Sequence, residues 1–390
     1  MKSIKLKRGK EIAVLRRHPW VFSGAIHEKE EGIEEGEIIR IVSFENKFLG
    51  IAHYQNSSIA ARIFTFRDDV ISEQFWCNRI HSAFQYRIDL GLLNGDNNCF
   101  RLVFGESDLM PGLVLDYYGG NIVFQAHSIG MHKLSGVITQ ALKSVLGDRL
   151  KTIYDKSKES LPGGYASGIN NSFLFGNNSG AIVLENGNKF HVDWVNGQKT
   201  GFFLDQRDNR KLLAHYSVGK KVLNTFCYTG GFSVYAGMAG AAMVHSVDSS
   251  KRAIELTEKN ILENNITSHQ GICMDAFDFL KNDLSDYDVI VLDPPAFAKH
   301  REVKHKAVIG YKNLNYSTLK RMKAGSTLFT FSCTQVVDKI LFFNTVTAAA
   351  IESGREIRIL HYLHQPADHP INPLHPEGEY LKGMVIKIIN

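Results

Sequence analysis

Cysteine is scarce in this sequence, and the few cysteines present do not come in pairs. There are five among 390 residues, widely spaced, and no two of them form a C-x-x-C motif. This spacing argues against a structural zinc site, and we expect no bound metal. An odd number of scattered thiols also favours a reducing compartment, so we predict a cytoplasmic protein with free cysteines at positions 77, 99, 227, 273 and 333.

Signals for export or membrane insertion are also lacking. The basic residues near the start are not followed by the apolar run that a secretory signal needs. Residues 222–247 contain no Asp, Glu, Lys or Arg, but Asn224, Thr229 and His245 interrupt this stretch. It is typical of a strand, a glycine turn, a helix and a second strand rather than of a membrane span. We therefore predict no membrane partner.

The overall excess of positive charge is small, with a formal net charge of +5. Attraction to a polyanion must then come from local clusters of charge. Residues 1–20 contain seven basic residues against one acid, and residues 299–323 contain eight against one. A single basic run is often only a solvated surface, but the two runs together favour a nucleic acid as partner.

The length suits two or three domains, and the 44% hydrophobic and 22% charged content is that of an ordinary soluble protein. Glycines and short β-like runs over residues 1–73 predict a small β-rich domain. Residues 74–185 combine helical periodicity with strand-like runs and predict an α+β linking domain. The strands expected in these two domains are 38–42, 59–66, 100–104, 113–118 and 121–126, with helices over 72–92 and 132–146 and more β structure from 151.

Residues 186–390 alternate between strands and helices, which predicts an α/β domain with a doubly wound sheet of parallel strands. Ligands of such sheets bind just outside the carboxyl ends of the strands. The residues that follow each strand are therefore the candidates for a site. The expected strands are 221–223, 243–247, 287–292 and 327–331, and the expected helices are 231–241 and 250–264.

Two strand ends predict half of an adenosine site. Residues 224–232 (NTFCYTGGF) place two glycines at a helix start, where a backbone can approach a ligand closely. Asp248 follows 18 residues beyond Gly230, near the position of the acid that binds ribose hydroxyls in βαβ nucleotide sites. For the glycines alone, a tight turn without a ligand is the alternative. The pattern G-x-G-x-x-G is absent, so the ligand need not carry a pyrophosphate, and S-adenosylmethionine carries none.

The next two strand ends add carboxylates. Asp275 stands where it could accept a hydrogen bond from an adenine amino group, although alone it would be an ordinary surface acid. Asp293 begins an Asp-Pro-Pro turn, whose prolines rigidify it and remove backbone donors. A rigid carboxylate beside a methyl donor suits orienting the amino group or a ring nitrogen of a nucleobase.

With these residues in view, the sequence resembles the bacterial 23S ribosomal RNA large-subunit methyltransferase I family, which makes 5-methylcytosine. The resemblance runs nearly end to end. It implies a PUA-like RNA-binding domain in residues 1–73, the linking domain in 74–185 and a Rossmann-like class I methyltransferase domain in 186–390. It also implies S-adenosylmethionine as cofactor and RNA as partner, either 23S rRNA or a large-subunit precursor. Besides the loops at Gly230 and Asp248, the matching segments are 18–24 (HPWVFSG), 101–106 (RLVFGE), 109–113 (LMPGL), 197–210 (GQKTGFFLDQRDNR), 293–295 (DPP), 368–370 (DHP) and 380–382 (YLK).

The same resemblance implies a set of site residues. The catalytic residues would be Cys333 and Asp293. Phe226 and Phe297 stand in turns, where aromatic rings either stack on a base or adenine or belong to the core. The implied cofactor-binding residues are Phe226, Tyr228, Thr229, Gly230, Asp248, Ser249, Asp275 and Asp293, and the implied substrate-binding residues are Arg207, Pro294, Pro295, Phe297 and Lys299.

Cys333 is the candidate nucleophile. Carbon 5 of cytosine is a poor nucleophile, so its methylation needs a covalent bond at carbon 6, and a thiolate is the natural attacker. Cys333 ends the strand after the Asp-Pro-Pro turn, where known cytosine-5 RNA methyltransferases carry their nucleophile. A buried structural cysteine is the alternative. Because Pro295 and Ala296 stand where two-cysteine enzymes have a second thiol, the base that removes the carbon 5 proton is left unassigned.

Two other functions stay open at this stage. An Asp-Pro-Pro turn followed by an aromatic residue also suits N-methylation of guanine or adenine, which needs no thiol. A non-catalytic RNA-binding assembly factor would keep the basic clusters without needing Gly230, Asp248, Asp275 and Asp293. Neither the target nucleotide nor the oligomeric state follows from the sequence.

Overall fold

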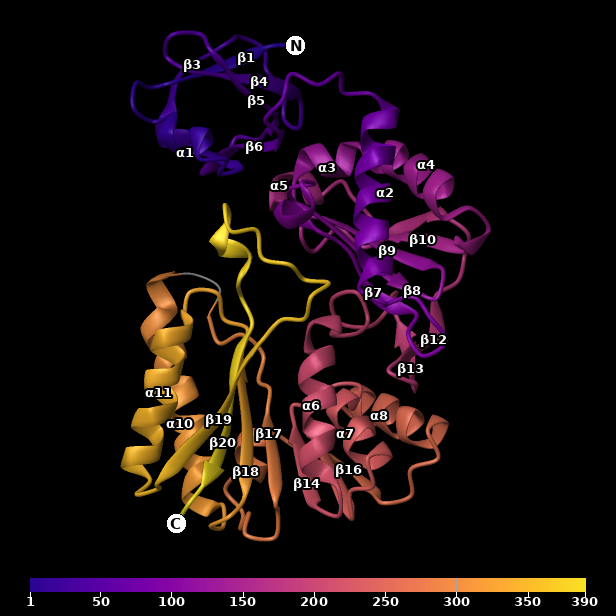
Figure 1. The fold of residues 1–390 in the computed structure, drawn as a ribbon, viewed down its shortest axis with the longest axis vertical. Coiled ribbons are helices and arrows are strands. Elements are labelled where there is room, and N and C mark those ends of the chain that lie inside the picture. The colour runs from indigo at the N-terminus through magenta and orange to yellow at the C-terminus, as the bar shows by residue number, and fades with distance from the viewer. Residues whose placement is uncertain (299–300) are drawn as a thin grey trace. The chain divides into compact units, whose positions relative to one another are not determined.

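The structure, a computed structural model, describes residues 1–298 and 301–390, which fold as two compact units (Figure 1). The first unit consists of Met1–Val183, Val192–Leu204 and Ala367–Gly378. The second unit consists of Leu184–His191, Asp205–Pro366 and Glu379–Asn390. The chain therefore passes between the units several times, and each unit is assembled from separate segments.

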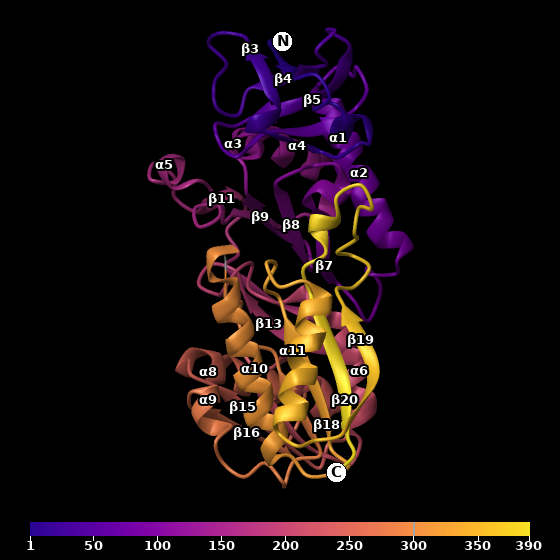
Figure 2. The same cartoon turned by 90° about the vertical axis from the view of Figure 1, so that its left-hand side faces the viewer.

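The first sheet of the first unit has six strands in the order β2-β6-β5-β4-β1-β3. Figure 2 labels three of them, β3, β4 and β5. Neighbouring strands are antiparallel, except that β1 runs parallel to β4. Burial alternates along β1 and β4, as at Ile39 and Ile41, while β5 and β6 are buried at most positions; the buried side chains of these strands contribute to an apolar core. The elements are β1 (Ser3–Leu6), α1 (Ile12–Leu15), β2 (Trp20–Phe22), β3 (Ile26–Lys29), β4 (Ile38–Val42), β5 (Phe48–Tyr54) and β6 (Ile59–Thr65).

The second sheet of the first unit has five strands in the order β11-β10-β9-β8-β7. Helices α2 and α4 bury their apolar stripes against it, including Trp76, Ile80 and Leu142. Ser72 caps α2, because its hydroxyl accepts a hydrogen bond from Phe75 N. The elements are α2 (Glu73–Asp89), β7 (Cys99–Phe104), β8 (Leu113–Tyr118), β9 (Asn121–Ala126), α3 (Ile129–Lys133), α4 (Ser135–Leu146), β10 (Thr152–Asp155), α5 (Gly163–Ala166) and β11 (Ser172–Phe175). The hairpin of β12 (Gly180–Glu185) and β13 (Asn188–Asp193) follows, and its tip, Leu184–His191, belongs to the second unit.

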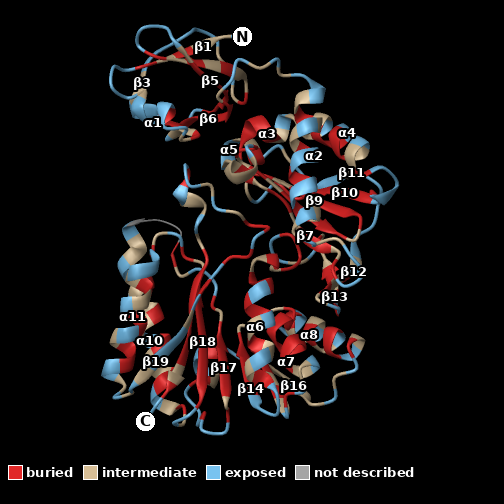
Figure 3. Cartoon of the chain, viewed as in Figure 1, coloured by how far each residue is buried: buried red, intermediate tan, exposed pale blue. Residues whose placement is uncertain are grey.

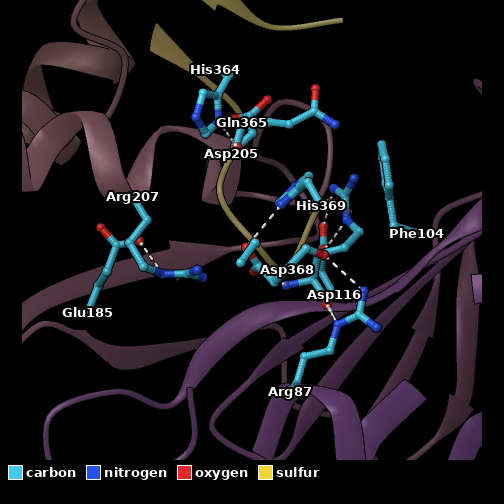
Figure 4. A network of polar contacts seen from close by, with 12 residues as sticks. Arg87, Phe104, Asp116, Glu185, Asp205, Arg207, His364, Gln365, Asp368 and His369 are labelled. Carbon is cyan, nitrogen blue, oxygen red and sulfur yellow. Dashed lines mark hydrogen bonds and ion pairs between the residues drawn. The ribbon is translucent and has the colours of Figure 1, made fainter. Parts of the chain in front are cut away.

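A buried guanidinium ties a segment from near the end of the chain to the first unit (Figure 4). Arg87 of α2 has no exposed surface and donates to both carboxylate oxygens of Asp108, at 2.6 and 2.8 Å. It also donates to the backbone oxygen of Asp368 at 2.9 Å. The carboxylate of Asp368 in turn accepts a hydrogen bond from Arg101 N at 2.9 Å. This network fixes the segment that contains the 368–370 motif.

The second unit is built on a seven-stranded sheet in the order β16-β15-β14-β17-β18-β20-β19. The first five strands of this order are parallel, and the last two pair antiparallel. Helices α6, α7 and α8 cover one face, and α10 and α11 cover the other (Figure 1). The elements are α6 (Arg207–Ser217), β14 (Lys221–Thr225), α7 (Gly231–Met238), β15 (Met243–Asp248), α8 (Lys251–Glu263), β16 (His269–Cys273), α9 (Ala276–Phe279), β17 (Val289–Leu292), α10 (Lys304–Arg321), β18 (Thr327–Ser332), α11 (Lys339–Glu352), β19 (Ile357–His364) and β20 (Lys382–Ile388).

The central strands of this sheet are buried on both faces (Figure 3). Val289 and Val291 of β17 belong to the core that includes residues of α6 and α7. Ile290 and Leu292 belong to the opposite core, with residues of α10 and α11. Strands that bury both faces need apolar residues at every position, which explains the uninterrupted apolar run of β17. Among the described residues, none of the helices has the length and apolar character to cross a membrane.

Most expected strands and helices are present, with some differences at their ends. The strands predicted over 113–118 and 121–126 have these bounds in β8 and β9. The helix predicted over 231–241 ends at Met238, because the turn that follows it contains Gly240 with a φ of +86°. In the second unit, the sequence did not predict α6, β16, α9, α10, α11, β19 or β20. The division into three domains stays a prediction.

A buried histidine of the first sheet packs against α2 and α3. His53 of β5 is 2% exposed, and its ring stacks on Trp76 with 6.1 Å between the ring centroids. Gly130 permits close packing here, because a Cβ at this position would lie 2.3 Å from His53 Cγ. Burial lowers the pKa of His53 to about 3, with a smaller effect from the charge of Arg62. The ring is therefore neutral in the folded protein at neutral pH.

We predict that His53 makes the first unit sensitive to acid. Its contribution to stability is fully present above its ordinary pKa of 6.5 and is lost as the pH falls toward about 3, because only the unfolded chain takes up the proton. At pH 4.5 the loss from this group is about 3 kcal/mol. Urea unfolding between pH 7 and 4.5 should show a shallower decline in His53→Leu than in wild type. Replacement of the exposed His81 by Leu is the control, and equal slopes in wild type and His53→Leu would contradict the prediction.

Candidate active site

The segments that follow the parallel strands of the second unit lie at one edge of the sheet. In the ladder, Thr225 at the end of β14 pairs with Val247 of β15 on one side and with Leu292 of β17 on the other. Asp248 pairs with Cys273 at the ends of β15 and β16. The loops that start after these residues therefore share the edge where ligands of doubly wound sheets bind.

The loop after β14 contains three residues with left-handed backbone conformations, and at one of them only glycine fits. Phe226, Tyr228 and Gly230 all have positive φ angles, of 55°, 48° and 73°. A Cβ at Gly230 would lie 2.5 Å from Thr257 Cγ2. Thr257 Oγ1 also donates to Tyr228 O at 2.9 Å, and Asn260 Nδ2 donates to Thr229 O at 2.8 Å. Helix α8 thus holds the loop in place.

Asp248 and Asp275 each bind backbone amides. Asp248 Oδ2 accepts from Tyr228 N at 3.0 Å and Oδ1 accepts from Ser250 N at 2.9 Å, while the carboxylate stays half-buried. Asp275 caps α9, because its Oδ1 accepts from Phe277 N and Asp278 N at 2.8 and 3.2 Å. Both side chains keep oxygen lone pairs for further hydrogen bonds, and Asp275 and Ser249 are exposed.

A row of aromatic rings connects these loops. Phe226 contacts Phe277 with 5.8 Å between ring centroids, and Phe277 contacts Phe297 at 6.1 Å. Phe297 packs on Tyr311 of α10 at 4.5 Å. Phe277 is 40% exposed, which makes it the ring most accessible to a planar ligand. Phe277 was not among the site residues predicted from the sequence, although an apolar residue two positions after Asp275 was the available signal.

Asp293 faces a second carboxyl group. Gln206 Nε2 donates to Asp293 Oδ2 at 3.0 Å. Burial and the negative charge of Asp205 raise the pKa of Asp293 to about 7. Asp205 Oδ2 accepts from the Tyr380 hydroxyl at 2.6 Å. Asp205, Gln206 and Tyr380 were not predicted as site residues, although each lies in a segment that carries the family resemblance.

Cys333 lies just beyond β18 and is half-buried. Its neighbour Thr334 joins the Asp-Pro-Pro segment, because Thr334 Oγ1 accepts from Phe297 N at 3.1 Å. The Tyr311 hydroxyl lies 2.6 Å from the same oxygen. The thiol and Asp293 therefore belong to two loops that are hydrogen-bonded to each other.

The predicted substrate-binding residues have different surroundings. Arg207 is 3% exposed, and its Nε lies 3.7 Å from Glu185 Oε2 (Figure 4). Pro294 is buried, Pro295 is exposed and Phe297 is half-buried. Lys299 lies outside the described residues. The roles assigned to the individual site residues from the sequence stay predictions.

Comparison with known proteins identifies the family. Residues 4–66 match a PUA-like domain, and residues 169–373 match an S-adenosylmethionine-dependent methyltransferase. The chain is 37% identical to ribosomal RNA large subunit methyltransferase I of Aeromonas hydrophila over 99% of each chain. It is 38% identical to the protein of that name from Shewanella frigidimarina, also over 99% of each. The chain belongs to the ribosomal RNA large subunit methyltransferase I family.

Solved structures share the fold of this methyltransferase. A protein from Streptococcus mutans, described as a SAM-dependent methyltransferase, superimposes with a TM-score of 0.83 at 22% identity, over 99% of this chain and 100% of that one. The chain SMU.776, solved in complex with SAH, gives 0.83 at 23% identity over the same shares. The predicted family, fold class and cofactor, S-adenosylmethionine, are confirmed.

The residues at the sheet edge fit S-adenosylmethionine. The loop around Gly230 brings backbone to the edge where a side chain has no room. Asp248 offers carboxylate oxygens of the kind that bind ribose hydroxyls. Asp275 and Phe277 offer an exposed carboxylate and an exposed ring, which suit the amino group and the plane of an adenine.

We predict that Gly230→Ala weakens S-adenosylmethionine binding at least about tenfold, because the Cβ meets Thr257 and displaces the loop. Gly240→Ala is the matched control, since Gly240 also has a positive φ, of +86°, but has nothing within 4 Å of an added Cβ. Isothermal titration calorimetry measures both. Equal affinities in the two variants would mean that the Gly230 loop does not hold the cofactor.

Proposed function

We propose that this protein transfers a methyl group from S-adenosylmethionine to carbon 5 of a cytosine in 23S ribosomal RNA, through a covalent adduct with Cys333. Large-subunit RNA as substrate is supported by the names of the relatives and by the PUA-like domain. The observation that carries the carbon 5 chemistry is a half-buried thiol whose loop is hydrogen-bonded to the Asp-Pro-Pro segment.

The cofactor would lie along the loop 226–231. Asp248 would bind its ribose hydroxyls, and Asp275 and Phe277 would bind its adenine. Bound there, S-adenosylmethionine supplies an electrophilic methyl group, which carbon 5 accepts. The row of rings from Phe226 through Phe277 to Phe297 would exclude water from this edge.

The reaction starts at carbon 6 of the cytosine. The Cys333 thiolate forms the bond from sulfur to carbon 6, the electrons of the carbon 5–carbon 6 double bond move to carbon 5–carbon 4, and a pair moves onto N3. N3 then needs a proton. Asp293 suits this step, because a carboxyl group with a pKa of about 7 is partly protonated at neutral pH and can donate.

After methyl transfer, N3 returns its proton to Asp293, and carbon 5 must lose its own proton. We assign this proton to Asp205. Its Oδ2 is held by the Tyr380 hydroxyl, and its Oδ1 is buried without a hydrogen-bond partner in the part of the chain that is described. The double bond between carbons 5 and 6 then re-forms and the thiolate leaves. The two carboxyl groups would thus act as an acid and a base in one site.

Replacement of Cys333 by Ala tests this mechanism. We expect methyl transfer to rRNA from a deletion strain to fall at least about a thousandfold, because no other group forms the covalent bond, while S-adenosylmethionine binding is kept. Transfer of labelled methyl groups measures the rate, and bisulfite sequencing locates the cytosine. Cys77→Ala, at another half-buried cysteine, is the control.

Full activity of Cys333→Ala would overturn the cysteine mechanism and favour N-methylation, which needs no thiol. Failure of the wild-type protein to bind S-adenosylmethionine would instead favour the non-catalytic assembly factor.

A further inference from the structure

A buried lysine lies beside Cys333 at the start of the neighbouring strand. β20 pairs antiparallel with β18, and Lys382 stands opposite Ser332 in this ladder. Lys382 is 7% exposed. Its Nζ donates to Thr334 O at 2.7 Å and to Tyr380 O at 3.0 Å. The side chain therefore crosses from β20 to the residue that follows Cys333.

An ammonium in this position needs a negative partner. Burying a charge is costly unless it is paired, and carbonyl dipoles satisfy only two of the three N–H groups. The hydrogen bonds recorded for Lys382 within the described ranges both go to backbone oxygens, and none goes to a carboxylate. Burial lowers the pKa of Lys382 to about 8. The negative charges of Cys333, Asp338 and Glu379 raise this pKa, and the effect of Cys333 is the largest of the three.

The two nearby carboxylates have other partners. Asp338, the N-cap of α11, lies 3.8 Å from Lys304 Nζ, and Glu379 lies 3.3 Å from Lys339 Nζ. Both acids are at the surface, where such pairs are weak and screened. From α10, the Tyr311 phenol also faces Cys333, but burial raises its pKa to about 12, so it stays neutral. Of these neighbours, the half-buried thiol of Cys333 is thus the one that suits the matching negative charge.

We propose that Lys382 is a positioning residue that holds Cys333 as a thiolate in an ammonium–thiolate pair. The proton of the thiol resides on Nζ and the electron pair stays on sulfur, ready to form the bond to a carbon electrophile. The role of this pair in methylation rests on the proposed function. The pair itself exists without RNA or cofactor, so it can be tested in the free protein.

Alkylation of Cys333 by iodoacetamide reports its thiolate directly. The rate is measured from pH 5.5 to 10 on the full-length protein, with the Cys333 peptide quantified by mass spectrometry. We expect the wild-type midpoint to lie at least about one pH unit below the 8.5 of a free thiol. Lys382→Met keeps the length of the side chain but removes its charge. It should raise the midpoint by at least about one unit, which slows alkylation at pH 7 about tenfold.

Three further measurements separate this role from a structural one. Lys382→Arg keeps the charge and should stay close to the wild-type profile. Lys339→Met removes an exposed cation next to Glu379 and should leave the profile unchanged. Cys227, which is 6% exposed, should stay unreactive in every variant whose second unit is folded.

Superimposable profiles of wild type and Lys382→Met would overturn the proposal. A wild-type midpoint at or above about 8.5 would also overturn it, even if Lys382→Met failed to fold. The proposed function fails separately. A shifted profile in Lys382→Met, together with full methylation by Cys333→Ala, would support the pair and remove the cysteine mechanism.

Discussion

The buried ion pair between Glu185 and Arg210 organises the second unit around its site. Glu185 has no exposed surface, and its carboxylate accepts from Arg210 at 2.8 and 2.7 Å and from the Tyr235 hydroxyl at 3.0 Å. These contacts join β12 to α6 and α7. Arg210 also packs against loop 226–231, because a Cβ at Gly231 would lie 3.0 Å from its Cδ. Its charge limits the rise of the Asp293 pKa. Loss of either partner would leave an unpaired buried charge, which costs about 3–5 kcal/mol.

Charge is distributed unevenly over the sheet edge that this ion pair supports. Near β15 and β16, the carboxylates of Asp248 and Asp275 bind backbone amides. Near β17, burial and the negative charge of Asp205 raise the pKa of Asp293 to about 7. Beyond β18, the Lys382 ammonium provides the positive charge that a thiolate needs. In the proposed function, the strand order therefore places the cofactor-binding residues next to the residues that do the chemistry.

The sequence could predict the ends of the strands but not the residues that distant parts of the chain place next to them. Asp248 and Asp293 come directly after the strands predicted over 243–247 and 287–292, so the local pattern was enough to locate them. Lys382 pairs with Ser332, which lies 50 residues earlier in the chain. No local hydrophobic periodicity predicts β20 or its register with β18. Arg207 was predicted to bind substrate, and this role stays a prediction, but the sequence did not indicate that its guanidinium is buried beside Glu185. Burial and long-range pairing decide such cases, and both depend on the complete fold.

A covalent trap tests the central claim most directly. In 23S RNA transcribed with 5-fluorocytidine, the fluorine on carbon 5 cannot leave as a cation, so an adduct formed during methyl transfer persists. With S-adenosylmethionine, the wild-type protein should form a complex that survives denaturing electrophoresis, and mass spectrometry should place the modified base on Cys333. Cys333→Ala should form none. Methylation of this RNA without an adduct, or an adduct on another cysteine, would contradict the account.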